Sequence, residues 1–158
     1  MDLDRVDRQL LRELSETGRA THQQLGETIG RSPTSIARRQ RSLEDAGIIR
    51  GYRADLDLAR LGYGALVHIR MTLASQSREQ LDAFEAAIAA SPSVVQCDLM
   101  SGSDDYFVTV LVGSLDHFAD VHREELARLP GVVRMESAFV LRQVVEPRMP
   151  PGWAGAAE

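Results

Sequence analysis

Apolar residues in the first third of the chain recur at the three- and four-residue spacing of amphipathic helices. The first such stripe contains Leu3, Val6, Leu10, Leu11 and Leu14. Asp4 stands where a side chain caps a helix start, and Gly18 stands where the helix stops. The pattern therefore predicts that the chain begins with a capped, half-buried helix.

Two further helices follow at short intervals. Thr21 and Gln24 have the spacing of a capping box, which predicts a second helix that ends at Gly30. Ser32 and Pro33 predict the start of a third helix, because serine caps well and proline fits the first helical position. Three short helices, the last two joined by a tight glycine turn, are typical of a helix-turn-helix unit. An ordinary three-helix bundle is the alternative at this point.

From about residue 48 the apolar pattern changes from helical spacing to alternation. Residues 48–58 have β character, and residues 59–64 form a short linker. Alternation then predicts strands near 65–73, 95–99, 106–112 and 132–144, and helical spacing predicts helices near 81–88 and 115–129. The order from residue 64 onward is βαββαβ, which is the ferredoxin-like pattern. The chain is thus predicted to be an α+β protein.

The predicted sheet has its helices on one side, so its other face is open. We expect that open face to be apolar and to carry Leu66, Val108, Val110 and Val140, with Val132 on the same side of the last strand. A large apolar face needs a cover. Two sheets packed face to face would provide one, and two-fold symmetry would present two recognition helices to DNA. We therefore expect a homodimer, with a tetramer or octamer as larger assemblies.

Composition narrows the class of protein. The chain has 158 residues, of which 44% are hydrophobic and 26% charged, and this suits one large or two small globular domains. Cys97 is the single cysteine, which excludes an internal disulfide and a cysteine-rich zinc cluster. No apolar run has the length of a membrane span, so no membrane partner and a cytoplasmic location are expected. No metal site or cofactor is predicted.

Charge is distributed unevenly. The net charge is -5, but residues 31–53 carry six arginines against only Glu44 and Asp45. The remainder from residue 54 onward is acidic. A locally basic segment in an otherwise acidic chain is typical of a DNA-binding domain joined to a second domain that does not bind DNA.

The third helix concentrates this charge on one side. If Ile36, Gln40 and Leu43 face inward, rotation by about 100° per residue turns Thr34, Arg38, Arg41 and Ser42 outward. Ser35 and Arg39 flank this arc, and Ser32 lies at the helix start. Arginine donates in a fork that fits phosphates and guanine edges. These seven residues are the predicted DNA contacts, whereas a merely solvated arginine face is the alternative.

At these positions the chain resembles the Lrp/AsnC family of bacterial and archaeal transcription factors. The resemblance rests on LDRVDRQLL, SPT, RR, L-E-x-x-G-I-I-x-G-Y, SGSDDY and LARLPGV, and it extends over about residues 2–146. It implies a winged-helix-like DNA-binding domain, a hinge, and a ferredoxin-like domain that dimerises and binds small effectors. Two residues depart from the family: Arg31 replaces an apolar residue and Gln40 a valine, and both are expected to loosen the packing of the third helix.

The resemblance gives a domain organisation. Residues 1–53 form the helix-turn-helix domain, 54–63 the hinge, 64–146 the effector-binding and oligomerisation domain, and 147–158 a flexible tail rich in proline and glycine.

A second candidate site lies at the turn before the third predicted strand. The family pattern there is close to G-D-x-D-Y, and this chain has Gly102, Ser103, Asp104, Asp105 and Tyr106. A glycine turn exposes N–H groups to a carboxylate, and Asp105 pairs with an ammonium in this hypothesis. The predicted effector-binding residues are Met100, Gly102, Asp104, Asp105, Tyr106 and Ser137. The alternative is a purely structural turn, because hairpin turns have this composition.

The predicted function is a sequence-specific DNA-binding transcriptional regulator whose activity a small effector, an amino acid, modulates. It is not expected to be an enzyme, and no catalytic residue is predicted. Two alternatives remain. Some haem-biosynthesis decarboxylases resemble the same two-domain architecture and act on a tetrapyrrole, although the SGSDDY turn is acidic. A protein that binds effector without binding DNA is the other.

Overall fold

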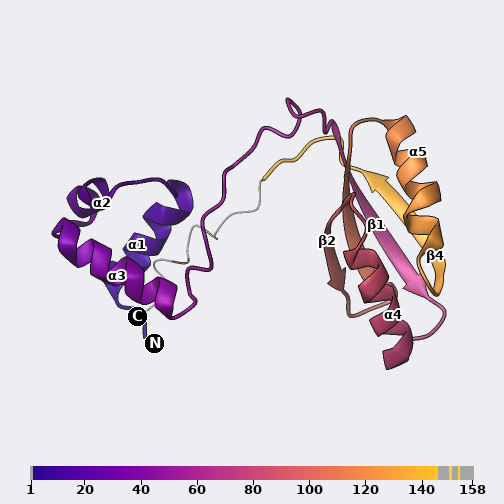
Figure 1. The fold of residues 1–158 in the computed structure, drawn as a ribbon, viewed down its shortest axis with the longest axis horizontal. Coiled ribbons are helices and arrows are strands. Elements are labelled where there is room, and N and C mark those ends of the chain that lie inside the picture. The colour runs from indigo at the N-terminus through magenta and orange to yellow at the C-terminus, as the bar shows by residue number, and fades with distance from the viewer. Residues whose placement is uncertain (1, 146–149, 151–152, 154–158) are drawn as a thin grey trace. The chain divides into compact units, whose positions relative to one another are not determined.

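The computed structural model describes residues 2–145 together with Pro150 and Trp153. The tail predicted at 147–158 therefore lies outside the described residues, apart from these two. The chain divides into two compact units (Figure 1). The first contains the N-terminal residues up to Asp55, and the second is Leu56–Val144. No helix in the described part of the chain combines the length and apolarity that a bilayer crossing requires.

The first unit contains the three predicted helices, α1 (Arg5–Glu16), α2 (His22–Ile29) and α3 (Pro33–Asp45) (Figure 1). Each begins where the sequence predicted, because a side-chain oxygen accepts the backbone N–H three residues later. The capping residues are Asp4, Thr21 and Ser32. The predicted helix starts are confirmed.

The core of the first unit is small and closed. It is formed by Leu10, Leu14, Leu25, Ile36 and Leu43. Ile36 and Leu43 of α3 are fully buried, whereas the buried Oε1 of Gln40 has no hydrogen-bond partner in the described part of the chain. The expectation that Arg31 and Gln40 loosen this helix stays a prediction. The exposed Arg31 side chain donates to the neighbouring Gly30 carbonyl, while Gln40 Nε2 donates to the hydroxyl of Tyr52.

The second unit is a four-stranded antiparallel sheet with strand order β2-β3-β1-β4. Its strands are β1 (Ala65–Leu73), β2 (Val94–Leu99), β3 (Tyr106–Val112) and β4 (Val132–Phe139), and its helices are α4 (Arg78–Ala89) and α5 (Leu115–Glu124) (Figure 1). A short 3-10 turn at Leu126–Arg128 follows α5. This arrangement confirms the predicted βαββαβ order.

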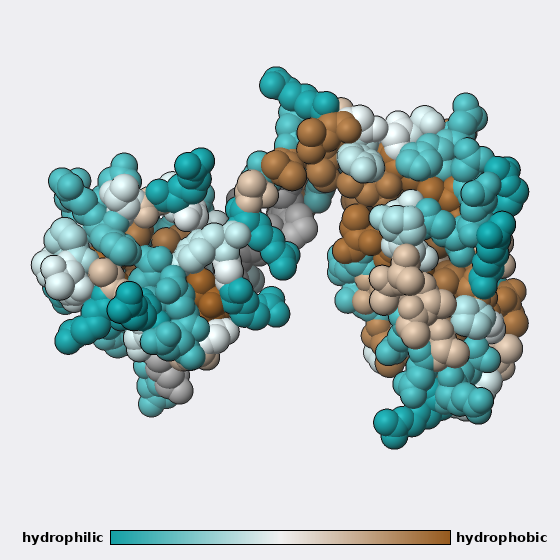
Figure 2. All heavy atoms as spheres, viewed as in Figure 1, coloured by the Kyte–Doolittle hydropathy of each residue, from teal (hydrophilic) through white to brown (hydrophobic). Residues whose placement is uncertain are grey.

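Residues 48–58, for which β character was predicted, form no strand. A strand needs a hydrogen-bonding neighbour, and no strand pairs with this segment within the described part of the chain. Several of its apolar side chains are exposed instead, among them Leu56, Leu58 and, just beyond, Leu61. Figure 2 shows hydrophobic residues, in brown, at the surface of the segments that join the two units.

The two faces of the sheet differ from the prediction. Val108 pairs with Ile69 and Val110 with Val67, and paired residues point to the same face. Because Val67 and Ile69 belong to the helix-covered core, Val108 and Val110 lie there as well, fully buried. The prediction that these two valines line the open face is wrong. β3 is apolar at almost every position, so alternation alone cannot tell its two faces apart.

The open face is instead a mixture of apolar and polar side chains. Leu66 lies on it as predicted, with His68, Arg70 and Thr72 from the same strand. A bulge between Thr72 and Leu73 pairs Val132 with Leu73, which moves Val132 to the helix-covered face, against the prediction. The backbone N–H of Val140 donates to the carbonyl of Leu66, just beyond the end of β4. Only part of the open face is therefore apolar.

Candidate DNA-binding face and effector pocket

One side of α3 is fully available to a partner. Thr34, Arg38, Arg41 and Ser42 are exposed, as the helical spacing predicted. Within residues 2–145, neither Arg38 nor Arg41 forms an ion pair or a side-chain hydrogen bond, so both guanidinium groups can bind an anion. Ser35 is half-buried beside them, and the Ser32 hydroxyl accepts the Ser35 backbone N–H at 3.3 Å.

Arg39 has a different environment from its neighbours. Its Nη1 donates to the carboxylates of Asp4 and Asp7, at 2.7 Å each, and thus ties α3 to α1. Asp7 is almost completely buried. Hydrogen bonds from Arg39 to Asp7 and then to Asp4 raise the pKa of the guanidinium. The structure brings Arg39 to α1, whereas the sequence placed it beside the DNA-contacting arc.

Tyr52 is a residue that the sequence analysis named only as part of a motif. Its hydroxyl accepts from Gln40 Nε2 and donates to Glu44 Oε1, at 2.7 Å in both cases. Gln40 Nε2 also approaches Glu44 Oε1 at 3.2 Å. The three side chains form a closed cluster on one flank of α3, which we call the Tyr52 cluster.

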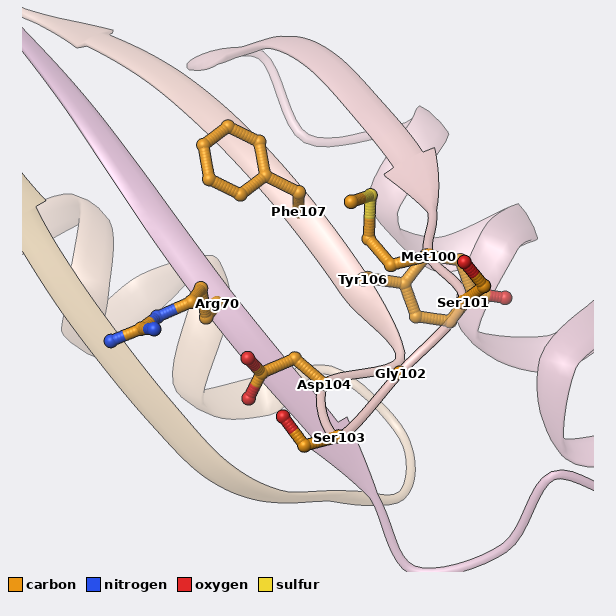
Figure 3. A pocket seen from close by; sticks show the side chains of 8 residues that line it. All are labelled: Arg70, Met100, Ser101, Gly102, Ser103, Asp104, Tyr106 and Phe107. Carbon is orange, nitrogen blue, oxygen red and sulfur yellow. The ribbon is translucent and has the colours of Figure 1, made fainter.

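The predicted turn in the second unit forms part of the wall of a pocket. Its volume is about 200 Å³, and it is lined by Arg70, Met100, Ser101, Gly102, Ser103, Asp104, Tyr106 and Phe107 (Figure 3). Gly102 has a φ of +143°, a conformation that side-chain-bearing residues rarely adopt. Figure 3 shows the Asp104 and Ser103 side chains on the side of the turn that faces β1. Met100, Gly102, Asp104 and Tyr106 are thus brought together as predicted.

Asp105 does not line this pocket. It is almost completely buried, its Oδ2 accepts the backbone N–H of Leu73 at 2.7 Å, and its Oδ1 accepts from Gln76 Nε2 at 2.6 Å. Its own backbone N–H donates to the carbonyl of Met71. One carboxylate oxygen therefore holds the turn to the end of β1, and the other holds it to the segment between β1 and α4. Asp104 is the carboxylate that the structure leaves at the pocket.

Tyr106 and Ser137 also differ from expectation. The Tyr106 ring is buried against Phe84, with ring centres 4.3 Å apart, and its hydroxyl donates to Glu85 Oε1 at 2.8 Å. Burial, with the Glu85 hydrogen bond, raises the pKa of Tyr106. Tyr106 therefore borders the pocket mainly as part of the core. Ser137 pairs with Ile69 and so faces the helix-covered side, away from the pocket.

Arg70 supplies the cation that the sequence analysis did not identify. It lies on the open face of β1 and lines the pocket, and its Nη2 donates to Glu136 Oε2 at 2.6 Å. Arg134 also bonds to Glu136. Alternation along β1 places Arg70 and Ile69 on opposite faces of the sheet. The position of Arg70 near the turn, however, follows only from its pairing with Phe107 of β3. Arg70 therefore lines the pocket while its guanidinium is paired with Glu136, and Asp104 lines it as a carboxylate.

Comparison with known proteins agrees with this architecture. Residues 3–50 match a winged helix-turn-helix DNA-binding family, and residues 65–150 match the Lrp/AsnC ligand binding domain. An uncharacterised HTH-type transcriptional regulator of Sinorhizobium fredii is 40% identical over 77% of this chain and 95% of its own length. The leucine-responsive regulatory protein of Rhizobium meliloti is 38% identical, over 91% of this chain and 92% of its own.

Solved structures lead to the same class. A transcriptional regulator of Neisseria meningitidis, crystallised with L-Met, superposes with a TM-score of 0.89 at 30% identity, covering 94% of this chain and 97% of the other. A helix-turn-helix unit followed by this ligand-binding domain defines a DNA-binding transcriptional regulator. The chain belongs to the Lrp/AsnC family.

Proposed function

We propose that this regulator binds its target sequence through the exposed face of α3 and that an amino acid at the Gly102 turn modulates the binding. The proposal that α3 binds DNA rests on one observation: Arg38 and Arg41 are exposed. Arg39, in contrast, is paired with Asp4 and Asp7. The N-terminal part of a recognition helix reads base edges, and Thr34, Arg38 and Ser42 lie on one side of it. Ser32 and Ser35, at the start of α3, extend this face toward the phosphates.

The pocket supports an amino-acid effector by its charges. A zwitterion needs a cation for its carboxylate and an anion for its ammonium. Asp104 offers the anion, and Arg70, which keeps further N–H donors besides the Nη2 bonded to Glu136, offers the cation. The Neisseria meningitidis relative was crystallised with L-Met. We assign the ammonium contact to Asp104, because both oxygens of Asp105 already accept hydrogen bonds.

We further propose that the protein acts as a homodimer or a larger even assembly in the cytoplasm, where its DNA is found. The exposed apolar side chains of the connecting segment and the partly apolar open face of the sheet support association. A two-fold axis would offer two α3 helices to two half-sites.

The test is DNA binding by the full chain, measured by fluorescence anisotropy on a labelled duplex from upstream of its own gene. The Arg38→Ala/Arg41→Ala variant should lose measurable binding at moderate salt, since each lost phosphate contact lowers the salt slope by about 0.9. Arg78→Ala/Arg142→Ala removes the same charge from the second unit and should bind like the parent. Unchanged affinity in the Arg38/Arg41 variant would remove α3 as the DNA-binding element.

A further inference from the structure

The Tyr52 cluster occupies a defined flank of α3. Gln40 and Glu44 are one helical turn apart, and at about 100° per residue Glu44 lies roughly 60° from Arg41 around the helix. Arg39, which bonds to α1, lies on the opposite flank. The segment that carries Tyr52 therefore runs along the side of α3 nearest Arg41.

The path of the chain fixes this segment at several points. Gly47 adopts a φ of +70°, and the N–H groups of the next two residues both donate to the carbonyl of Leu43, at 2.9 and 3.2 Å. Ile49 then packs against the core of the first unit. The Tyr52 ring lies 3.9 Å from the position that a Cβ at Gly18 would occupy. The segment is thus turned back onto the first unit and held there by the tyrosine.

Two arginines flank the anchored tyrosine. Arg50 and Arg53 are both exposed, and within residues 2–145 neither forms an ion pair. Glu44 of α3 already accepts the Tyr52 and Gln40 hydrogen bonds. Two exposed arginines without an ion pair in residues 2–145, each within two residues of the anchored Tyr52, are suited to phosphate oxygens.

We propose that the Tyr52 cluster is a positioning device that holds Arg50 and Arg53 beside α3 as a second set of contacts to the DNA backbone. This inference rests on the DNA-binding face proposed for α3. Tyr52 and Gln40 act through the two arginines and are positioning residues. Gln40 contributes to the cluster through its side-chain N–H, which donates to the Tyr52 hydroxyl.

The tyrosine keeps its proton under working conditions. Burial, together with the hydrogen bond to Glu44, raises the pKa of Tyr52 to about 12. The hydroxyl therefore remains a donor to Glu44 throughout the neutral range, and the cluster stays closed. The same hydrogen bond, followed by that from Gln40, lowers the pKa of Glu44, which stays an acceptor.

The first experiment counts phosphate contacts. Binding of the full chain to a labelled mixed-sequence duplex is measured over a salt series by fluorescence anisotropy. Arg50→Ala/Arg53→Ala should reduce the slope of log affinity against log salt by nearly two units, at about 0.9 per contact. The Arg78→Ala/Arg142→Ala control should leave the slope unchanged. An unchanged slope in Arg50→Ala/Arg53→Ala would overturn the proposal, while loss of binding in Arg38→Ala/Arg41→Ala alone would still support α3.

The second experiment tests positioning by a double-mutant cycle. Tyr52→Phe should weaken duplex binding by about fivefold in the parent and have no effect in the Arg50→Ala/Arg53→Ala background, as expected for residues that act together. Gln40→Val removes the other partner of the hydroxyl and should behave in the same way. Tyr63→Phe is the matched control, because Tyr63 is an exposed tyrosine outside the cluster. Equal losses in both backgrounds would assign the cluster to the fold of α3 alone and would refute the positioning role.

Discussion

The two candidate sites are built in different ways. On α3 a single helix provides the whole exposed face, so spacing along the chain determines which residues stand together. The pocket of the second unit combines Arg70 of β1, Phe107 of β3 and the turn around Gly102. Its composition depends on strand register, which is a relation between distant parts of the sequence. A helical site can thus be predicted from local pattern, and a sheet site cannot.

Both sites nevertheless share one feature. In each, two identical residues are adjacent in the sequence and only one of them is available. Arg39 is bonded to Asp4 and Asp7 while Arg38 is exposed, and Asp105 is buried while Asp104 lines the pocket. In each pair the engaged residue stabilises the element that presents the other. Paired substitutions can therefore separate stability from binding.

The largest effect is expected at Asp105. Asp105→Ala leaves the backbone N–H of Leu73 and the Gln76 amide without their acceptor and should lower the free energy of unfolding by about 2–4 kcal/mol. Urea unfolding of the full chain measures it. Asp104→Ala is the matched control and should change stability by less than about 0.5 kcal/mol. Equal losses in both variants would contradict the structural role of Asp105.

The next effect concerns the pair on α3. Arg39→Ala leaves the buried carboxylate of Asp7 without its cation and should lower the unfolding free energy by about 2–3 kcal/mol. Arg38→Ala should leave stability unchanged and weaken binding to duplex DNA, because its guanidinium has no partner within the described part of the chain. Thermal unfolding measures the effect of each variant on stability, and fluorescence anisotropy measures its effect on DNA binding. The distinction fails if Arg38→Ala unfolds as early as Arg39→Ala.

Sequence patterns predicted more of the first unit than of the second, and the reason is physical. Caps and helical spacing gave all three helix starts of the first unit and the exposed Arg38 and Arg41. They did not reveal that Arg39 turns to α1, since Asp4 was interpreted only as a helix cap and Asp7 was not singled out. In the second unit the element order was predictable, but the faces of Val108 and Val110 were not. In a strand that is apolar at nearly every position, the sequence does not show which residues face the core.

A smaller effect should distinguish the two charges of the pocket. Asp104→Asn removes the anion proposed for an ammonium, and Arg70→Gln removes the cation proposed for a carboxylate. Each should weaken binding of the effector amino acid by about tenfold, equivalent to about 1.4 kcal/mol. Calorimetric titration of the parent with the twenty amino acids identifies the ligand for this comparison. Ser137→Ala serves as the control, because Ser137 faces away from the pocket.

An opposite result at these positions would be informative. If Asp104→Asn binds the amino acid as tightly as the parent does, the ammonium has another partner and the assignment to Asp104 is wrong. If no amino acid binds the parent, the Gly102 turn is structural and the effector is of another class. Where the parent binds an amino acid, Ser137→Ala should bind it equally well, because this residue lies outside the pocket.

The smallest effect is a pH dependence at Asp4. Its pKa lies below the ordinary value of 3.8, first because its carboxylate accepts the backbone N–H of Asp7 and then because it bonds to Arg39. A carboxyl whose folded pKa is lowered stabilises the fold above its unfolded pKa, and this contribution disappears as the pH falls through the folded value. Asp4→Asn keeps a good helix cap but removes the charge, so at neutral pH it should lower the unfolding free energy by roughly 0.5 kcal/mol. The difference from the parent should begin to shrink as the pH falls to 3.8 and should disappear once the pH is below the lowered pKa of folded Asp4. Asp2→Asn, at an exposed residue, is the control, and a difference at Asp4 that stayed constant with pH would exclude the charge as its cause.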